Sequence, residues 1–250
     1  MGRVQRAIGA LAFLAVLSLP GMVFGGNTGD INQSGLENIA DIAQVGDLNQ
    51  AYIDQLSYTA GNQGQIEQDG YNNLVRQNQT GDGNYAFTHQ EGQGHTASLT
   101  QVGEGNRAEQ KQYDGGHVAV ISQEGDSNQA FQTQLNSSNT ATIFQTGILT
   151  SSNYARQYQD GFQNVAVIGQ TGLGNNQAEQ WQNGSYNNAV ISQSGSSNYA
   201  YQYQSGSSHT VSLTQIGNNN WASQTQYGSG QRSIITQVGN GNVATVVQGP

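Results

Sequence analysis

One segment decides the fold of this chain: residues 187–204, which read NNAVISQ, then SGSS, then NYAYQYQ. The same seven-residue phrase, Asn-x-Ala-x-x-x-Gln, occurs twice, at 187–193 and at 198–204. Each phrase places alternate residues on opposite sides, as a β-strand requires. The joint between them contains Gly195, which accepts positive φ angles without steric cost. The segment therefore predicts a strand, a tight turn and a second strand.

The phrase repeats along the whole chain after residue 26. Its closing Gln recurs twenty times between Gln33 and Gln248, and sixteen of the nineteen intervals are 11 residues long. The fifth position is aliphatic in nine of ten alternate phrases, as at Ile191, and is mostly Gln in the phrases between, as at Gln202. The structural unit is thus two unlike strands, about 22 residues long. We predict an all-β parallel β-solenoid of ten coils over residues 26–250.

The inward side of each strand carries Asn, Ala, the fifth residue and Gln. Stacked coils bring like residues within about 4.8 Å, so Gln and Asn side chains can pass amide hydrogen bonds from coil to coil. The predicted Gln ladder positions are Gln101, Gln112, Gln123, Gln134, Gln145, Gln159, Gln170, Gln182, Gln193, Gln204, Gln215, Gln226, Gln237 and Gln248. The predicted Asn ladder positions are Asn106, Asn128, Asn139, Asn164, Asn187, Asn198, Asn220 and Asn242. The predicted turn glycines are Gly103, Gly125, Gly161, Gly184, Gly195, Gly206, Gly217 and Gly239.

The N-terminus has a different composition. Arg3 and Arg6 precede an apolar run from Ala7 to Leu19, and small residues follow it. This run is too short to span a bilayer and is typical of a secretory signal peptide, which we predict over residues 1–25. The chain has no cysteine, so an exported product cannot be held together by disulfides.

The sequence also predicts how the repeat array ends. The first phrase follows the predicted signal peptide directly, and the last is followed by Gly249 and Pro250 alone. Soluble solenoids usually hide their terminal strands under atypical end units. We therefore expect two uncapped sheet edges, which would pair head to tail with further copies and form an open-ended filament.

The repeat array of this chain resembles the curli subunits, the functional amyloids of bacterial biofilms. The curlin repeat, Ser-x5-Gln-x-Gly-x-x-Asn-x-Ala-x3-Gln, is matched at 95–112 with His95 in place of Ser, and at 187–204 with Asn187 in place of Ser. The resemblance implies a structural subunit that passes through the periplasm and is secreted through a curli-type channel with chaperones. It also implies partnership with a nucleator subunit and assembly into cell-surface fibres. The chain differs in having ten coils, and in lacking a Gly-rich leader between the predicted signal and the first repeat.

Other functions find little support in the residues. His95, His117 and His209 occupy the Asn column and His89 points outward, with no carboxylate at a matching offset, so we expect no catalytic, metal or cofactor site and no enzyme activity. Five basic against sixteen acidic residues, after the signal peptide is removed, disfavour nucleic-acid binding. A monomeric secreted solenoid that binds a ligand or surface, of the ice-binding or adhesin type, is one alternative, although an ice-binding Thr column would be interrupted by Val118 and Val120. A minor nucleator subunit is another.

Overall fold

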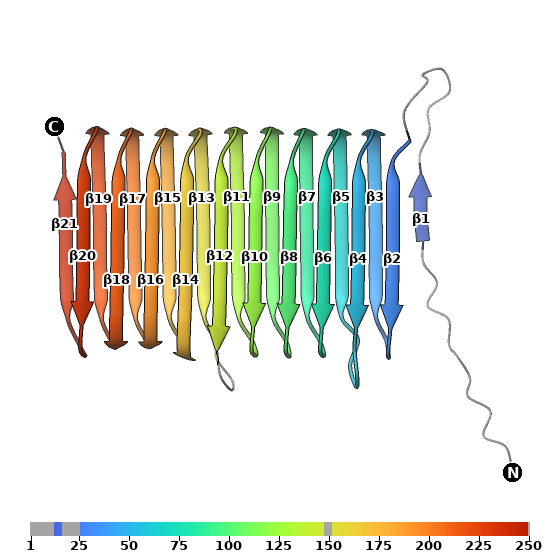
Figure 1. Ribbon diagram of the computed structural model, residues 1–250, viewed down its shortest axis with the longest axis horizontal. Coiled ribbons are helices and arrows are strands. Elements are labelled where there is room, and N and C mark those ends of the chain that lie inside the picture. The colour runs from blue at the N-terminus through green and yellow to red at the C-terminus, as the bar shows by residue number, and fades with distance from the viewer. Residues whose placement is uncertain (1–12, 17–25, 148–151, 250) are drawn as a thin grey trace, which may run out of the picture.

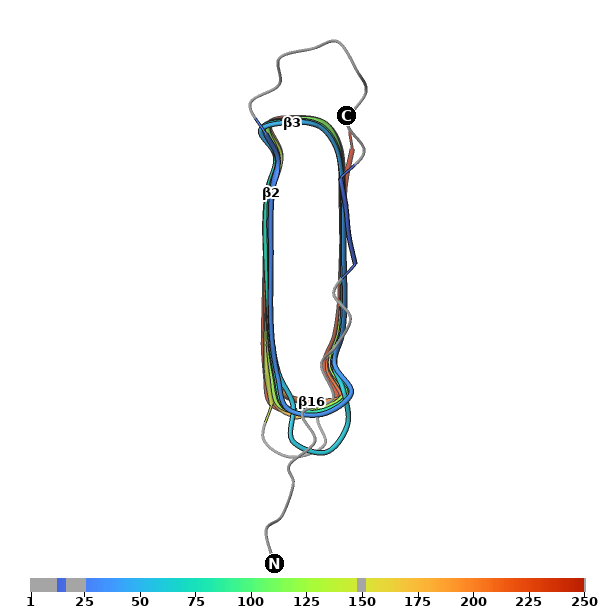
Figure 2. The ribbon, with the colours of Figure 1, turned by 90° about the vertical axis from the view of Figure 1, so that its right-hand side faces the viewer.

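The computed structural model describes residues 13–16, 26–147 and 152–249. It confirms the predicted all-β parallel solenoid: two sheets face each other, and the chain passes from one to the other at each turn (Figures 1 and 2). Sheet A contains the odd-numbered strands and sheet B the even-numbered strands. Figure 2, seen along the stack, shows the coils superimposed as one flattened loop with two straight sides.

The strand bounds follow the repeated phrases. Sheet A consists of β1 (Phe13–Val16), β3 (Ile39–Asp47), β5 (Gln63–Tyr71), β7 (Tyr85–Gln93), β9 (Arg107–Gly115), β11 (Gln129–Ser137), β13 (Tyr154–Phe162), β15 (Gln177–Ser185), β17 (Tyr199–Ser207), β19 (Trp221–Ser229) and β21 (Val243–Gln248). Sheet B consists of β2 (Thr28–Ser34), β4 (Gln50–Leu56), β6 (Leu74–Thr80), β8 (Thr96–Val102), β10 (Val118–Glu124), β12 (Thr140–Gly147), β14 (Val165–Gly174), β16 (Asn188–Ser196), β18 (Thr210–Asn218) and β20 (Arg232–Val238). We number the coils from β2–β3 (coil 1) to β20–β21 (coil 10).

The register is that of the sequence repeat. Ala166 pairs with Ala189 and Gln170 with Gln193, so each residue type lies above its own kind. The longer joint after β4 leaves this register intact, because its extra residues form a loop outside the stack. There the Asp82 carboxylate accepts hydrogen bonds from the Thr59 hydroxyl and from the backbone N–H groups of Tyr58 and Thr59. These bonds hold the pKa of Asp82 well below its usual range.

The space between the sheets is filled by the predicted inward residues. Ala and the aliphatic fifth residues are buried in nearly every coil, together with the Gln and Asn columns. The apolar part of this core is thin, because each coil contributes only one or two Ala residues and one or two larger aliphatic side chains. Buried polar side chains therefore make up much of the core, and their hydrogen bonds decide whether the fold is stable.

Coil 3 interrupts the apolar core. Its fifth residues are Gln77 and Thr88, where most other coils carry an aliphatic residue on sheet B. The Gln77 amide donates to the Thr88 hydroxyl (3.0 Å) and to the Gln65 carbonyl (2.9 Å), but its Oε1 is buried without a partner in the described part of the chain. The buried apolar residues consequently form two clusters that divide at this coil, with Val75 in one and Ala86 in the other.

This interruption generates a stability prediction. The double substitution Gln77→Leu/Thr88→Val removes the unpaired side-chain oxygen of Gln77, and it removes both partners of the hydrogen bond between the Gln77 amide and the Thr88 hydroxyl. It also joins the two apolar clusters. We expect the free energy of unfolding to rise by about 1–3 kcal/mol, measured by urea denaturation. Gln132→Leu is the matched control, because it breaks the hydrogen bonds of Gln132 with Gln110 and Gln157 and should destabilise the protein. Destabilisation by both variants would contradict this reading of coil 3.

The first coil has an additional strand beside it in the unprocessed chain. β1 lies within the predicted signal peptide, the rest of which falls outside the described residues, and it pairs in parallel with residues 41–44 of β3. This edge of sheet A is therefore covered while β1 is attached, and the bare edge expected for the chain without residues 1–25 stays a prediction. β2, β20 and β21 each have a partner strand on one side only within residues 26–147 and 152–249. Among the described residues there is also no helix long and apolar enough to span a membrane.

Candidate functional site: the buried amide ladders

The closing glutamines form two continuous columns, one in each sheet. In sheet B, Gln170 Nε2 donates to Gln193 Oε1 (2.8 Å), and Gln193 Nε2 donates to Gln215 Oε1 (2.9 Å). Sheet A carries the equivalent chain, as from Gln182 to Gln204 (2.9 Å). All fourteen predicted Gln positions from 101 to 248 lie in these two columns.

The second amide hydrogen of most closing Gln residues has a role that the sequence did not reveal. Gln193 Nε2 also donates to the backbone carbonyl of Gln177 in the opposite sheet (2.9 Å), and Gln204 Nε2 donates to that of Asn188 (3.1 Å). Apart from Gln33 and Gln226, the closing Gln residues thus join neighbouring coils and also tie the two sheets together. A column of like residues predicts the first bond, but the second depends on how the sheets face each other.

A third Gln column runs along the fifth position of sheet A. It begins at Gln110, continues through residues 132, 157, 180 and 202, and ends where Gln224 donates to the Ser233 hydroxyl (2.9 Å). Gln110 Oε1 has no partner in the described chain because Thr88, the residue before it in the column, donates nothing to it. This column therefore extends only through the coils that carry Gln there.

The Asn columns work differently in the two sheets. In both, the side-chain oxygen of one coil accepts the backbone N–H of the next, as when Asn187 N–H donates to Asn164 Oδ1 (3.0 Å). On the sheet A side, the side-chain amides also bond to one another, as from Asn198 to Asn176 (3.0 Å). On both sides the amide also donates to a turn carbonyl, as from Asn198 to Gly217 (2.8 Å) and from Asn187 to Gly206 (3.1 Å). The predicted side-chain ladder of Asn is thus present in the sheet A column, whereas the sheet B column has only the bonds that involve the backbone.

The columns have a direction. In both closing Gln columns the amide nitrogen donates towards the C-terminal coil, from Gln33 to Gln55 at one end and from Gln226 to Gln248 at the other. In the Asn columns the donor belongs to the later coil, as in Asn242 to Asn220. Each end of the stack therefore presents a defined pattern of donors and acceptors.

Buried histidines take over the role of Asn on the sheet B side. His95 Nε2 lies 3.1 Å from the Glu91 carbonyl, and His95 Nδ1 accepts the backbone N–H of His117 (3.3 Å). Because a backbone N–H can only donate, Nδ1 is unprotonated and the proton lies on Nε2. The His95 and His117 rings stack with centroids 5.2 Å apart. As the sequence suggested, these histidines belong to the column.

The predicted turn glycines lie where two coils approach most closely. Gly195 has a φ of 118°. A Cβ built on it would lie 2.0 Å from the Gly217 carbonyl oxygen of the next coil. Asp114 and Asn136, which replace Gly in two joints, also adopt positive φ. The glycines let the turns stack at strand spacing, which the ladders require.

Comparison with known families bears directly on this repeat. Residues 70–103, 184–217 and 206–239 match the curlin associated repeat. The chain therefore contains curlin repeats. The repeats support a curli-type amyloid subunit family, which is a structural family and in general extracellular. No curated protein matches the chain.

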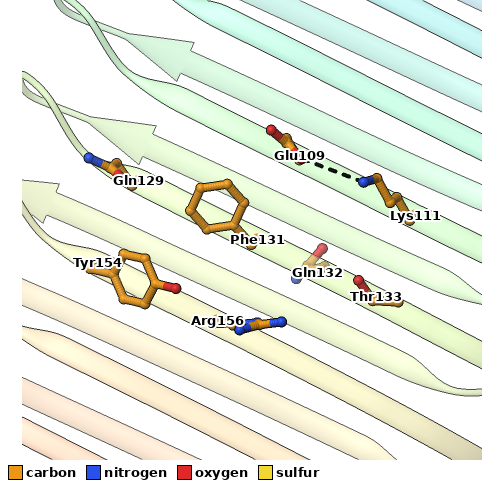
Figure 3. A pocket seen from close by; sticks show the side chains of 8 residues that line it. All are labelled: Glu109, Lys111, Gln129, Phe131, Gln132, Thr133, Tyr154 and Arg156. Atoms are coloured by element: carbon orange, nitrogen blue, oxygen red, sulfur yellow. Dashed lines mark ion pairs between the residues drawn. The ribbon is translucent and has the colours of Figure 1, made fainter.

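The outer face of this curlin-repeat protein is distinct on sheet A. It carries aromatic residues that contact one another along the stack, as do Tyr158 and Trp181 (5.0 Å between ring centroids). A shallow groove on this face is shown in Figure 3. The groove is lined by Glu109, Lys111, Gln129, Phe131, Gln132, Thr133, Tyr154 and Arg156. Lys111 pairs with Glu109 (3.7 Å), whereas Arg156 lies over the Trp181 ring (4.9 Å from Cζ to the centroid).

The ladders of the curlin-repeat protein generate a prediction on stability. Gln193→Glu/Gln204→Glu places two carboxylates among buried acceptor oxygens and removes four amide donors. We expect a loss of several kcal/mol, because unpaired buried groups cost about 1–3 kcal/mol each and charged groups cost more. Urea denaturation provides the measurement. Gln177→Glu, on the exposed outer face of β15, is the matched control and should change stability little. Equal stability of the two variants would refute the ladder.

The stacked histidines generate a pH prediction. Burial lowers the pKa of His95 from 6.5 to about 4, and burial also lowers the pKa of His117. A depressed histidine pKa means that the unfolded chain binds more protons, so stability is complete above pH 6.5 and falls as the pH drops towards 4. The variant His95→Asn/His117→Asn restores the usual column residue and should lose this part of the pH dependence. Denaturation midpoints between pH 7.5 and 4.5 measure it; parallel profiles for both proteins would contradict the assignment.

Proposed function

We propose that this chain is a secreted structural subunit that assembles head to tail into curli-like amyloid fibres at the cell surface and in the biofilm matrix. Such fibres serve adhesion and aggregation. The curlin repeats and the uninterrupted parallel solenoid support this proposal. The observation that carries it is the complementarity of the two ends of the stack.

In the Gln columns, the C-terminal face of the stack has free amide donors and the N-terminal face has free acceptor oxygens. Gln237 and Gln248 each use one amide hydrogen inside the stack, on the carbonyls of Trp221 in coil 9 and Arg232 in coil 10, and the second is free within the described chain. At the other end, Gln33 and Gln44 donate to the next coil but receive no donor on Oε1 from any described residue. If coil 1 of one copy follows coil 10 of another, each free donor meets a free acceptor.

The Asn columns support the same contact with reversed roles. Asn220 Oδ1 accepts the backbone N–H of Asn242, and the Asn242 side-chain oxygen accepts nothing within the described residues. Asn38 Oδ1 accepts from Asn62, while no described acceptor receives the Asn38 N–H. Coil 1 would thus donate in the Asn column and accept in the Gln columns. Only head-to-tail stacking satisfies both, since head-to-head contact would set acceptors against acceptors in the Gln columns.

Secretion and its partners follow from the proposed role. Residues 1–25 would be removed as the signal peptide, which would also remove β1 and expose the edge of β3. Periplasmic transit, a curli-type channel with chaperones and a separate nucleator subunit complete the proposed pathway. Ten regular coils favour a major fibre subunit over a nucleator, because each further coil adds the same ladder bonds.

A monomeric secreted solenoid that binds a ligand or a surface is the second candidate. The groove on sheet A favours it, since it combines the half-buried ring of Tyr154 with the charged groups of Lys111 and Arg156. The two candidates differ in the behaviour of the purified protein. A binding solenoid would remain a monodisperse particle at micromolar concentration.

For the fibre, we expect the protein without residues 1–25 to assemble at micromolar concentration into filaments with a meridional reflection near 4.7–4.8 Å. Gln237→Glu/Gln248→Glu should act as a chain terminator. Its N-terminal face can still join a growing end, but its C-terminal face then sets carboxylates against Gln33 and Gln44. Added at one part in ten to unaltered protein, it should slow seeded elongation, followed by light scattering. Gln129→Glu, on the exposed face of β11, should not. Absence of filaments would refute the proposal, and failure to terminate would refute the polarity.

A further inference from the structure

The outer face of sheet B is uncharged over six consecutive strands. From β8 to β18, the three outward positions between the inward Asn-column and closing Gln residues carry only Thr, Ser, Val, Asn, Phe and Gly. The same positions of sheet A in these coils include Arg107, Glu109, Lys111, Arg156 and Glu179. We call the outward residues of β8 to β18 the neutral face. A surface of this size without charge is typical of a face that another sheet covers.

Phe144 and Gly169, which pair across neighbouring strands of the neutral face, are its largest and its smallest residue. Phe144 is 49% exposed and stands in a column whose neighbours are Ser122 and Gly169. Gly169 lies within β14 and has no positive φ. A Cβ on it would meet nothing closer than the Ile191 carbonyl oxygen at 4.0 Å. Neither backbone conformation nor crowding inside the chain therefore requires glycine here, although glycine weakens a strand. Glycine in such a place commonly marks the close approach of another molecule.

The neutral face is self-complementary about the boundary between β12 and β14. A two-fold axis along the strand direction at this boundary would set coil 6 against coil 7, coil 5 against coil 8, and coil 4 against coil 9. The outermost of these pairs has identical residues: β8 presents Thr96, Ser98 and Thr100, and β18 presents Thr210, Ser212 and Thr214. In the next pair, Val120 faces Val190 and Ser122 faces Ser192. In the central pair, Phe144 of each copy faces Gly169 of the other.

We propose that the neutral face pairs with the neutral face of a second copy, with each Phe144 ring seated over the partner's Gly169. The occupant is thus a copy of this chain, in a filament running in the opposite direction, because the two-fold axis reverses the direction of stacking. This proposal rests on the proposed fibre.

The area of the neutral face favours pairing of filaments over pairing of single molecules. Six strands at about 4.8 Å and a strand length of about 18 Å give roughly 500 Å² per copy. Stable dimers bury roughly 800 Å² per partner. A single pair of molecules falls short, but every subunit of a filament adds the same contact to one rigid array. Lateral pairing should therefore follow filament growth.

A swap of the two central residues tests the proposal. Phe144→Gly removes the ring and Gly169→Phe fills the space over β14, so each single variant should form unpaired filaments. The double variant Phe144→Gly/Gly169→Phe exchanges ring and gap across the same axis and should restore pairing. Filament mass per length distinguishes the forms: we expect the unaltered protein and the double variant to show twice the value of either single variant. Thr225→Phe, an added ring on the outer face of sheet A, is the control and should leave pairing unchanged.

The outcomes separate this inference from the fibre itself. Should the unaltered protein form only single filaments, or pairs that both single variants retain, the neutral-face contact is refuted and the fibre proposal stands. Loss of pairing in the double variant as well would also refute the contact. If no filaments form at all, the fibre proposal fails and this inference fails with it. Electron cryomicroscopy of paired filaments should show the two members with opposite polarity.

Discussion

The structure depends on the hydrogen bonding of amide groups buried between two closely spaced sheets. A coil of this chain contributes little apolar area, mainly from Ala and one aliphatic side chain, so burial of Gln and Asn is unavoidable. Each buried amide is tolerable only when its donors and acceptor are paired. The columns achieve this by sharing one bond between successive coils and a second with the opposite sheet. Strand register is therefore a condition of stability and not merely a result of packing.

The same condition explains why the stack is directional. An amide has distinct donor and acceptor ends, and a column of equivalent amides must orient them alike, as Gln170, Gln193 and Gln215 do. The ends of the stack then differ in chemistry: in the Gln columns the C-terminal end has free N–H groups and the N-terminal end free oxygens, and in the Asn columns these roles are reversed. Histidine fits into this scheme only as one neutral tautomer, because His95 Nδ1 must accept where Asn Oδ1 would. Charge, whether on Glu or on a protonated His, conflicts with it.

Much of this fold follows from the sequence because its period is strict. The spacing of Gln, Gly and Asn gave the strands, their register and the inward columns, including Gln193 and Asn198. The bond from Gln193 to the Gln177 carbonyl could not be predicted, since it depends on the offset between the facing sheets. The split of the Asn columns depends on turn geometry in the same way. The pairing of β1 with β3 was missed because residues 13–16 carry no repeat signal.

The central claim is that each molecule forms ten stacked layers and that the ladders continue from the last coil of one copy to the first coil of the next. Solid-state NMR on fibres mixed from ¹⁵N-labelled and ¹³C-labelled chains measures this directly, because every ¹⁵N–¹³C contact between side chains is intermolecular. We predict contacts from the Gln237 and Gln248 amides to the Gln33 and Gln44 side chains. Contacts between identical residues, such as Gln193 with Gln193, would show each chain lying flat in one layer and would contradict the account.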